Sequence, residues 1–130
     1  MNGKHRDNKG FTLMEMLIVV AIIAVLVAIA IPTFSGSLHK AKVAADEANV
    51  RAYYAQLQMD YLLNDEYDAT IGPDLTGYLN TSISFSDGSS VELGAGYYLV
   101  RHAAAIESWN GYYIYYACNK GDCKMILGGP

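Results

Sequence analysis

The chain has 130 residues, of which 52% are hydrophobic and 17% charged. This length fits one domain and is too short for two independent cores. A net charge of −4 disfavours a generally basic nucleic-acid binder, and the apolar content together with 11 tyrosines excludes intrinsic disorder. The apolar residues are concentrated near the N-terminus, which argues against a soluble cytosolic enzyme.

The N-terminal region combines a polar tail with a long apolar segment. Residues 1–10 carry three basic side chains and one acidic side chain, and an unbroken apolar run extends from Met16 to Ile31. Counted from Phe11, the stretch reaches about 31 Å as a helix at about 1.5 Å per residue, which matches a bilayer core of about 30 Å. The positive tail is expected to stay in the cytoplasm, which places the C-terminal part of the chain outside.

Two simpler interpretations of this segment compete. One is a secretory signal peptide cleaved at Ala28-Ile29-Ala30, and the other is a plain signal anchor. Glu15 argues against both, because a carboxylate costs about 2.5–3.5 kcal/mol at the bilayer centre, although less near an interface. A segment that needs only hydrophobicity has no reason to carry this residue. The alternative for Glu15 itself is an incidental position near the lipid headgroups.

The string KGFTLMEMLIVVAIIAVLVAIAIP closely resembles the N-terminus of type IV pilins and pseudopilins. In that family a prepilin peptidase cuts after a glycine and methylates the new N-terminal phenylalanine, and these positions match Gly10 and Phe11. The family's glutamate, five residues into the mature chain, matches Glu15. The proline within its apolar helix matches Pro32. The resemblance covers residues 9–34, and beyond them the likeness is only architectural.

Glu15 has a physical explanation in this context. Cleavage after Gly10 removes the three basic residues of the tail and creates an α-amino group on Phe11, one helical turn from Glu15. A buried carboxylate is tolerated when it meets an opposite charge. Among parallel helices, Glu15 of one subunit can meet the Phe11 ammonium of its neighbour and set the axial register, as one buried polar residue does in a coiled coil.

The helix is predicted to run from about Phe11 to Leu63. Pro32 removes a backbone hydrogen bond, so we expect a kinked, continuous helix rather than an end near Ser35-Gly36. Beyond it, small and apolar residues recur at spacings of three and four, which predicts a stripe that packs against the protein's own sheet, with part of the remaining surface against sister helices. The stripe comprises Leu38, Ala41, Ala45, Ala48, Ala52, Ala55, Met59 and Leu62. The opposite side is expected to face solvent and carries Lys40, Lys42, Asp46, Glu47, Arg51 and Asp60.

The C-terminal part shows strand patterns. A loop is expected over residues 64–82, followed by a hairpin around Asp87-Gly88 and by strands at Tyr97–Arg101, Gly111–Cys118 and Lys124–Leu127. The predicted fold class is α+β, with the long N-terminal helix packed on a C-terminal antiparallel β-sheet of about four strands. The expected organisation is a cleaved leader at 1–10, a transmembrane and assembly helix at 11–34, and a globular domain at 35–130 with its sheet at 83–127.

Cys118 and Cys123 enclose a four-residue polar turn between the last two strands. Cysteines that face each other there lie within the Cα range of about 4.4–6.8 Å that a disulfide needs, and export favours oxidation. Zinc is the rival, but it needs four ligands, and the histidines are His5, His39 and His102. We therefore predict a disulfide and no metal site.

Other site patterns are weak. Asp65, Glu66 and Asp68 resemble a calcium loop faintly, and some pseudopilins bind calcium, but the twelve-residue order is missing. His102 has no nucleophile beside it in the sequence, and neither G-x-S-x-G nor a phosphate-binding pattern occurs. The sequence therefore predicts no catalytic residue, no cofactor and no enzyme.

The resemblance implies a structural subunit of a type IV pilus-like filament. Before assembly the chain would cross the bacterial cytoplasmic membrane once, and afterwards it would lie in an extracellular filament. The implied partners are other copies of itself, minor pilins, the prepilin peptidase/methyltransferase, an inner-membrane assembly platform and, before assembly, membrane lipid. The alternatives are a type II secretion pseudopilin, a competence pilin that captures DNA, and a membrane-anchored enzyme. Few basic residues beyond the helix and the lack of a site constellation disfavour the last two.

Overall fold

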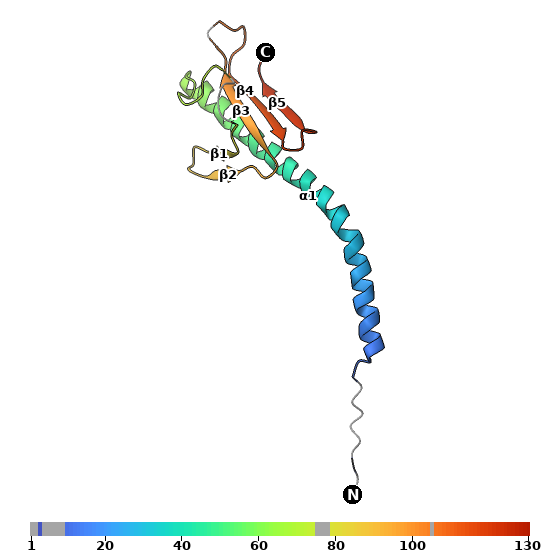
Figure 1. Ribbon diagram of the computed structural model, residues 1–130. Coiled ribbons are helices and arrows are strands. Elements are labelled where there is room, and N and C mark those ends of the chain that lie inside the picture. The colour runs from blue at the N-terminus through green and yellow to red at the C-terminus, as the bar shows by residue number, and fades with distance from the viewer. Residues whose placement is uncertain (1–2, 4–9, 75–78, 105) are drawn as a thin grey trace. The chain divides into compact units, whose positions relative to one another are not determined.

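The computed structural model describes residues 3, 10–74, 79–104 and 106–130. The expected leader lies outside the described residues except for Gly3 and Gly10, as do residues 75–78 of the expected loop. Figure 1 shows the elements, and the α+β class is confirmed. They are helix α1 (Leu13–Asn64) and strands β1 (Ser82–Ser84), β2 (Ser90–Glu92), β3 (Gly96–His102), β4 (Tyr112–Cys118) and β5 (Lys124–Gly128). The chain divides between Ser37 and Leu38 into two compact units.

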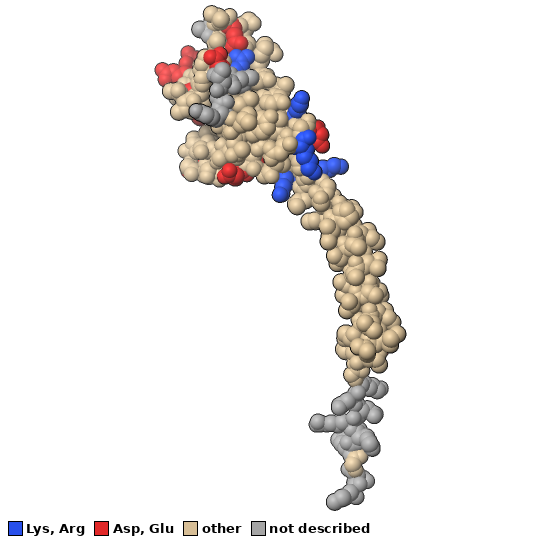
Figure 2. Space-filling view, in the orientation of Figure 1, with Lys and Arg blue, Asp and Glu red and all other residues tan. Residues whose placement is uncertain are grey.

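The first unit contains the apolar part of α1. The helix begins at Leu13, two residues later than predicted, and contains a segment that is long and apolar enough to cross a membrane. Every side chain from Leu13 to Ser37 is exposed. The face of this segment seen in Figure 2 carries no charged side chain among its described residues. These apolar side chains therefore have no cover within the described chain.

The second unit is built around its own core. From Leu38 onwards, α1 lies along the strands and contributes Val50 and Leu57 to that core (Figure 1). The helix ends at Asn64, one residue after the predicted Leu63. It ends there because Asp65 adopts the left-handed conformation (φ 54°) and its N–H donates to the carbonyl of Tyr61 at 2.8 Å. Ile71 in the loop after the helix and Leu93 between β2 and β3 are also buried in this core. The strands supply the remaining buried members, which are Ile83, Tyr98, Tyr112, Ile114, Tyr116, Cys118 and Met125.

The face of α1 that packs is not the predicted one. All eight residues of the small-residue stripe are exposed, among them Leu62 at 76%. The buried and half-buried face instead carries larger side chains, which are Val43, Val50, Tyr53, Tyr54, Leu57 and Tyr61. Both sets recur at spacings of three and four, so periodicity alone does not choose between them. The bulkier set removes more apolar area from water, and it faces the sheet for that reason.

The charged side of the helix was also predicted wrongly at one position. Asp46 was expected in solvent, yet it is only 2% exposed. Its carboxylate accepts hydrogen bonds from the backbone N–H groups of Gly94 (2.7 Å) and Ala95 (2.8 Å) and from the Tyr116 hydroxyl (2.9 Å). Asp46 thus ties the helix to the β2–β3 connection and to β4.

The strands form two antiparallel sheets rather than one sheet of about four. β1 and β2 form the predicted hairpin around Asp87-Gly88, and β3, β4 and β5 form a three-stranded sheet in that order. Asn80 joins them through one bridge to Tyr98. The next residue, Thr81, accepts a hydrogen bond from the N–H of Leu93 instead, so the chain leaves the edge of β3 and pairs with β2.

Candidate functional site

The expected processing site lies immediately before the helix. Gly10 and Phe11 are exposed and precede the first helical residue, and Phe11 exposes 81% of its surface. No heavy atom lies within 4 Å of the place that a Cβ would occupy on Gly10. A protease that must draw this segment out as an extended strand therefore meets no obstruction from the described residues.

Glu15 takes part in a capping box with Thr12. The Thr12 N–H donates to a carboxylate oxygen of Glu15 at 2.8 Å, and the Glu15 N–H donates to the Thr12 hydroxyl at 3.2 Å. This reciprocal pair satisfies two N–H groups that the start of a helix leaves without an intrahelical partner. This capping box was not predicted, although the sequence indicates it as Thr-x-x-Glu directly before an apolar run.

Pro32 lies inside α1, and the helix continues through it. Since proline has no N–H, one backbone carbonyl of the preceding turn loses its partner. Hydroxyls nearby also engage the backbone, because Thr33 donates to the carbonyl of Ile29 (3.2 Å) and Ser37 donates to the carbonyl of Thr33 (3.3 Å). Side-chain bonds of this kind compete with the regular ladder and, together with Pro32, favour bending of the helix here.

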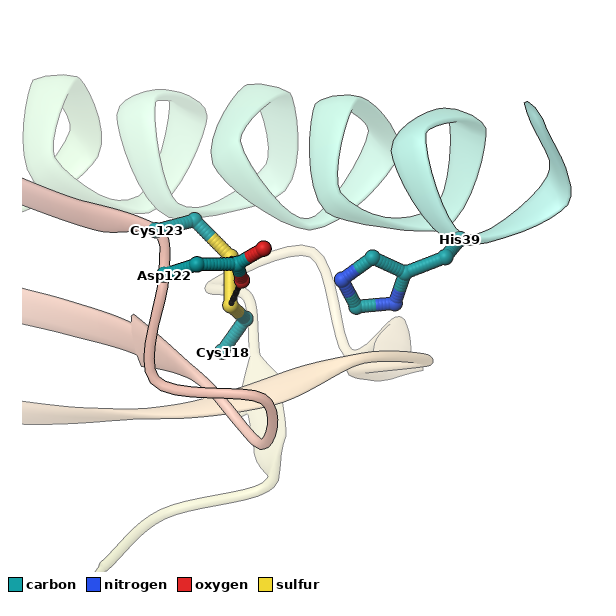
Figure 3. A group of neighbouring side chains, drawn as sticks. All are labelled: His39, Cys118, Asp122 and Cys123. Carbon is teal, nitrogen blue, oxygen red and sulfur yellow. Dashed lines mark hydrogen bonds between the residues drawn. A yellow bond between two sulfur atoms is a disulfide. The ribbon is translucent and has the colours of Figure 1, made fainter. Parts of the chain in front are cut away.

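The two cysteines form a disulfide in the second unit. Cys118 ends β4, Cys123 lies in the turn before β5, and their Cα atoms are 5.5 Å apart. The turn is further held by the Cys118 N–H, which donates to the carbonyl of Cys123 at 3.1 Å. Figure 3 shows His39 of α1 beside this turn, a neighbourhood that no local pattern in the sequence predicts.

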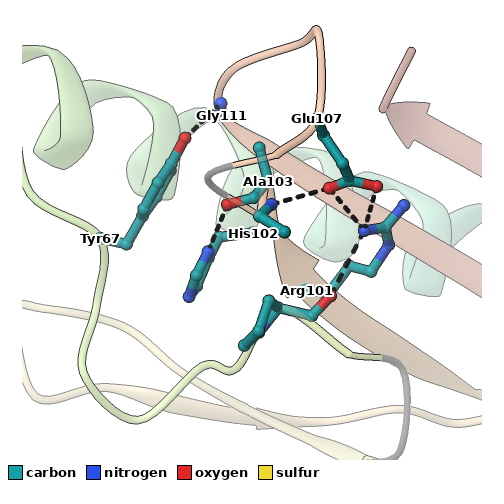
Figure 4. A network of polar contacts seen from close by, with 8 residues as sticks. Tyr67, Arg101, His102, Ala103, Glu107 and Gly111 are labelled. Atoms are coloured by element: carbon teal, nitrogen blue, oxygen red, sulfur yellow. Dashed lines mark hydrogen bonds and ion pairs between the residues drawn. The ribbon is translucent and has the colours of Figure 1, made fainter.

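A second polar cluster stabilises the connection between β3 and β4 (Figure 4). Arg101 donates to both carboxylate oxygens of Glu107 at 3.1 and 3.0 Å, and the Ala104 N–H donates to the same carboxylate at 2.7 Å. The Ala104 N–H and the Arg101 guanidinium lower the pKa of Glu107. His102 is stacked on Tyr67 with ring centroids 4.3 Å apart. These contacts order a loop and assemble no nucleophile with a base.

Tyr116 has a structural role as well. It is fully buried, and burial together with the Asp46 carboxylate raises the pKa of its phenol. The hydroxyl therefore stays protonated and remains a donor to Asp46. The polar groups at the centre of the second unit thus hold the helix and strands together.

The comparisons with known proteins agree with this arrangement at the N-terminus. The prokaryotic N-terminal methylation motif matches residues 5–31. Over 60 residues the chain is 42% identical to the type IV major pilin protein PilA of Myxococcus xanthus, a match that covers 46% of this chain and 27% of that protein. Over 67 residues it is 34% identical to the type II secretion system core protein G of Pseudomonas aeruginosa, which covers 52% and 47% of the two chains.

A third relative is the type IV narrow pilus major component PilA5 of Thermus thermophilus, which is 50% identical over 50 residues, covering 36% of this chain and 43% of the relative. The chain thus spans less than half the length of each of these relatives. No solved structure matches it. The motif and the relatives confirm the resemblance found in residues 9–34. Over this N-terminal region, the chain is similar to type IV pilins and pseudopilins.

Proposed function

We propose that this protein is a structural subunit of a type IV pilus-like filament, assembled from the cytoplasmic membrane. One observation carries the proposal: the methylation motif at residues 5–31 includes most of an apolar helical segment whose side chains are all exposed. An exposed apolar surface of this extent needs a cover, which is lipid before assembly and the helices of neighbouring subunits afterwards. The second unit has its own core, which does not include that segment.

Processing is the first step of the proposal. The prepilin peptidase hydrolyses the peptide bond between Gly10 and Phe11 and transfers a methyl group to the new amino group of Phe11. Removal of residues 1–10 takes away three of the nine basic side chains and one of the thirteen acidic ones, which leaves a side-chain charge of −6. The released subunit comprises the assembly helix at 11–34 and the globular domain at 35–130.

The capping box prepares Glu15 for assembly. In the single chain the Thr12 N–H already holds one carboxylate oxygen at the helix start, next to Phe11. A carboxylate accepts about four hydrogen bonds, so it can also receive the Phe11 ammonium of an adjacent subunit. Neutralising the pair inside an apolar bundle fixes the axial register of the subunits. Pro32 lets the helix adjust when a subunit leaves the bilayer.

The small-residue stripe of α1 has a place in this proposal. Its alanines are exposed in the single chain, and small side chains let helices approach closely. We assign the stripe to contact with sister helices, in place of the predicted contact with the protein's own sheet. The expected partners are other copies of this chain, minor pilins, the prepilin peptidase and the inner-membrane assembly platform.

Two variants with matched controls test the proposal. Gly10→Ala should abolish the mass decrease caused by processing, whereas Gly36→Ala, at another glycine with open space around it, should leave processing intact. Glu15→Gln keeps the size of the side chain and removes its charge, so it should be processed but fail to enter filaments, whereas Glu92→Gln on the exposed surface should assemble normally. A Glu15→Gln subunit that assembles like wild type would contradict the register role.

A pseudopilin of type II secretion is the second candidate, favoured by the similarity to core protein G. Deletion of the gene distinguishes the two. Loss of extracellular filaments with secretion intact supports the pilin, and loss of protein secretion without any filament at the surface supports the pseudopilin. The competence pilin is tested by DNA binding that weakens as salt is raised.

A further inference from the structure

Four potential metal ligands converge beside the disulfide turn. They are His39 on α1, Cys118 at the end of β4, and Asp122 and Cys123 in the turn, and their ligand atoms all lie within 4.8 Å of one another (Figure 3). A cavity of about 280 Å³ adjoins them, with His39, Asp122 and Cys123 in its wall. The four side chains come from one compact unit, so the fold itself brings them together.

His39 carries the second observation. Its Nε2 atom is buried and has no hydrogen-bond partner among the described residues. A buried polar atom without a partner is costly and calls for an explanation such as an ion. The imidazole lies against the turn that holds both cysteines, as Figure 3 shows. A neutral imidazole nitrogen with a free lone pair is a metal ligand.

We propose that the reduced chain binds one Zn²⁺ ion through Cys118, Cys123, His39 and Asp122, and that this ion and the disulfide are alternative states of the same site. Two thiolates, an imidazole and a carboxylate form the four-ligand tetrahedral set that zinc prefers. Bond lengths of about 2.0–2.3 Å place tetrahedral ligands about 3.3–3.8 Å apart, and all four ligand atoms already lie within 4.8 Å of one another, so after reduction the two sulfur atoms must separate from bonding distance to this spacing. Zinc with these three anions leaves a charge of −1, beside a cavity wall that contains both Lys40 and Glu47.

The two states exclude each other because a cysteine binds zinc as a thiolate, and the disulfide has no thiolate. The chain is synthesised with both cysteines reduced, and zinc binding releases one proton from each thiol. A disulfide-class oxidant later takes two electrons from the thiolate pair, the sulfur–sulfur bond forms, two thiolates of the oxidant are released, and Zn²⁺ leaves. A dithiol reductant reverses the exchange.

The two states differ in what they connect. The disulfide closes the four-residue turn between β4 and β5, at a sequence separation of five. Zinc would join that turn to His39, about 80 residues away in the sequence, and so tie the sheet to α1. Closing the longer loop restricts the unfolded chain more, so the zinc-bound reduced chain should keep the helix attached before the disulfide forms.

The test uses the full chain in detergent micelles, reduced with a phosphine, with Co²⁺ as the probe and Zn²⁺ as its competitor. The reduced wild type should bind one Co²⁺ with the visible bands of tetrahedral cobalt and a sulfur-to-cobalt charge-transfer band, and Zn²⁺ should displace it. His39→Ala should weaken binding at least about tenfold. His102→Phe, which keeps an aromatic ring against Tyr67, should bind like wild type.

Two results would overturn the proposal. One is a reduced wild type that binds cobalt no better than the Cys118→Ser/Cys123→Ser double variant. The other is a His39→Ala chain that is folded, as judged by circular dichroism, and binds cobalt like wild type.

A second measurement needs no variant. In the reduced wild type, Zn²⁺ should slow the alkylation of both cysteines at least about tenfold by mass spectrometry, and unchanged alkylation would also contradict the site.

Discussion

The buried carboxylate of Asp46 offers the sharpest test of how the second unit is held together. Asp46→Ala removes the acceptor for three donors, which are the N–H groups of Gly94 and Ala95 and the hydroxyl of Tyr116. Hydrogen bonds to a charged group contribute about 1.5–3 kcal/mol each, and a buried donor left without a partner costs about 1–3 kcal/mol, but these contributions are not additive. We therefore expect Asp46→Ala to lower the free energy of unfolding by about 3–5 kcal/mol.

Two further variants separate the contributions. Tyr116→Phe removes one donor and leaves both backbone bonds, so it should cost about 1–2 kcal/mol. The double variant should cost less than the sum of the two, because the residues share a hydrogen bond. Asp60→Ala, an exposed acid on the same helix, serves as the control and should change stability by no more than about 0.5 kcal/mol.

The assay is urea unfolding of the full chain in detergent, followed by the fluorescence of Trp109, the one tryptophan in the sequence. For Asp46→Ala, the urea concentration at the midpoint of unfolding should fall, and the dependence of the unfolding free energy on urea should stay unchanged. If this variant unfolds within about 0.5 kcal/mol of Asp60→Ala, the claim that Asp46 joins helix to strands is wrong.

Three other predictions concern separate parts of the chain. Gly96→Ala should destabilise by more than about 2 kcal/mol in the same assay, because the new methyl group would collide with the carbonyl of Ala117, whereas Gly94→Ala meets only ordinary contacts and should cost less. For Glu107, the lowered pKa means that its stabilisation is fully present above the ordinary value of 4.5 and is lost as the pH falls through the lowered value. The difference in thermal midpoint between wild type and Glu107→Gln should therefore shrink as the pH is lowered from 4.5, and a difference that stays constant throughout this acid titration would refute the reasoning. Ala52→Glu on the exposed stripe should leave the unfolding midpoint unchanged but block co-assembly with wild-type subunits, and normal incorporation into filaments would remove the stripe from the proposed helix contacts.

Local patterns predicted the elements well. The helix begins and ends within two residues of its expected bounds, and the hairpin at Asp87-Gly88 and the last three strands lie where alternation and turn residues placed them. These features depend on neighbours in the sequence, which is why one sequence suffices to find them. The pairing of Cys118 with Cys123 is equally local, since only a short turn separates them.

Apart from the capping box of Thr12 and Glu15, which is local, the failures concern contacts between distant residues. The helix has two faces with helical spacing, and only the presence of a sheet decides that the face with Tyr53 and Leu57 is buried. Side-chain size was a usable signal, because the chosen stripe consisted mainly of alanine. Asp46 gave no such signal, since its partners lie 48 to 70 residues away in the sequence. The division into two sheets likewise depends on distant contacts, because Asp46 of the helix binds the N–H groups of Gly94 and Ala95, which directly follow Leu93.

The central claim is that the chain is cut after Gly10 and then enters a filament. The most direct measurement is mass spectrometry of the N-terminal peptide from filaments sheared off the cells that make this protein. The account predicts a peptide that starts at Phe11 and carries one extra methyl group on its amino end. Recovery of the protein only in the membrane fraction, with residues 1–10 still attached, would contradict it.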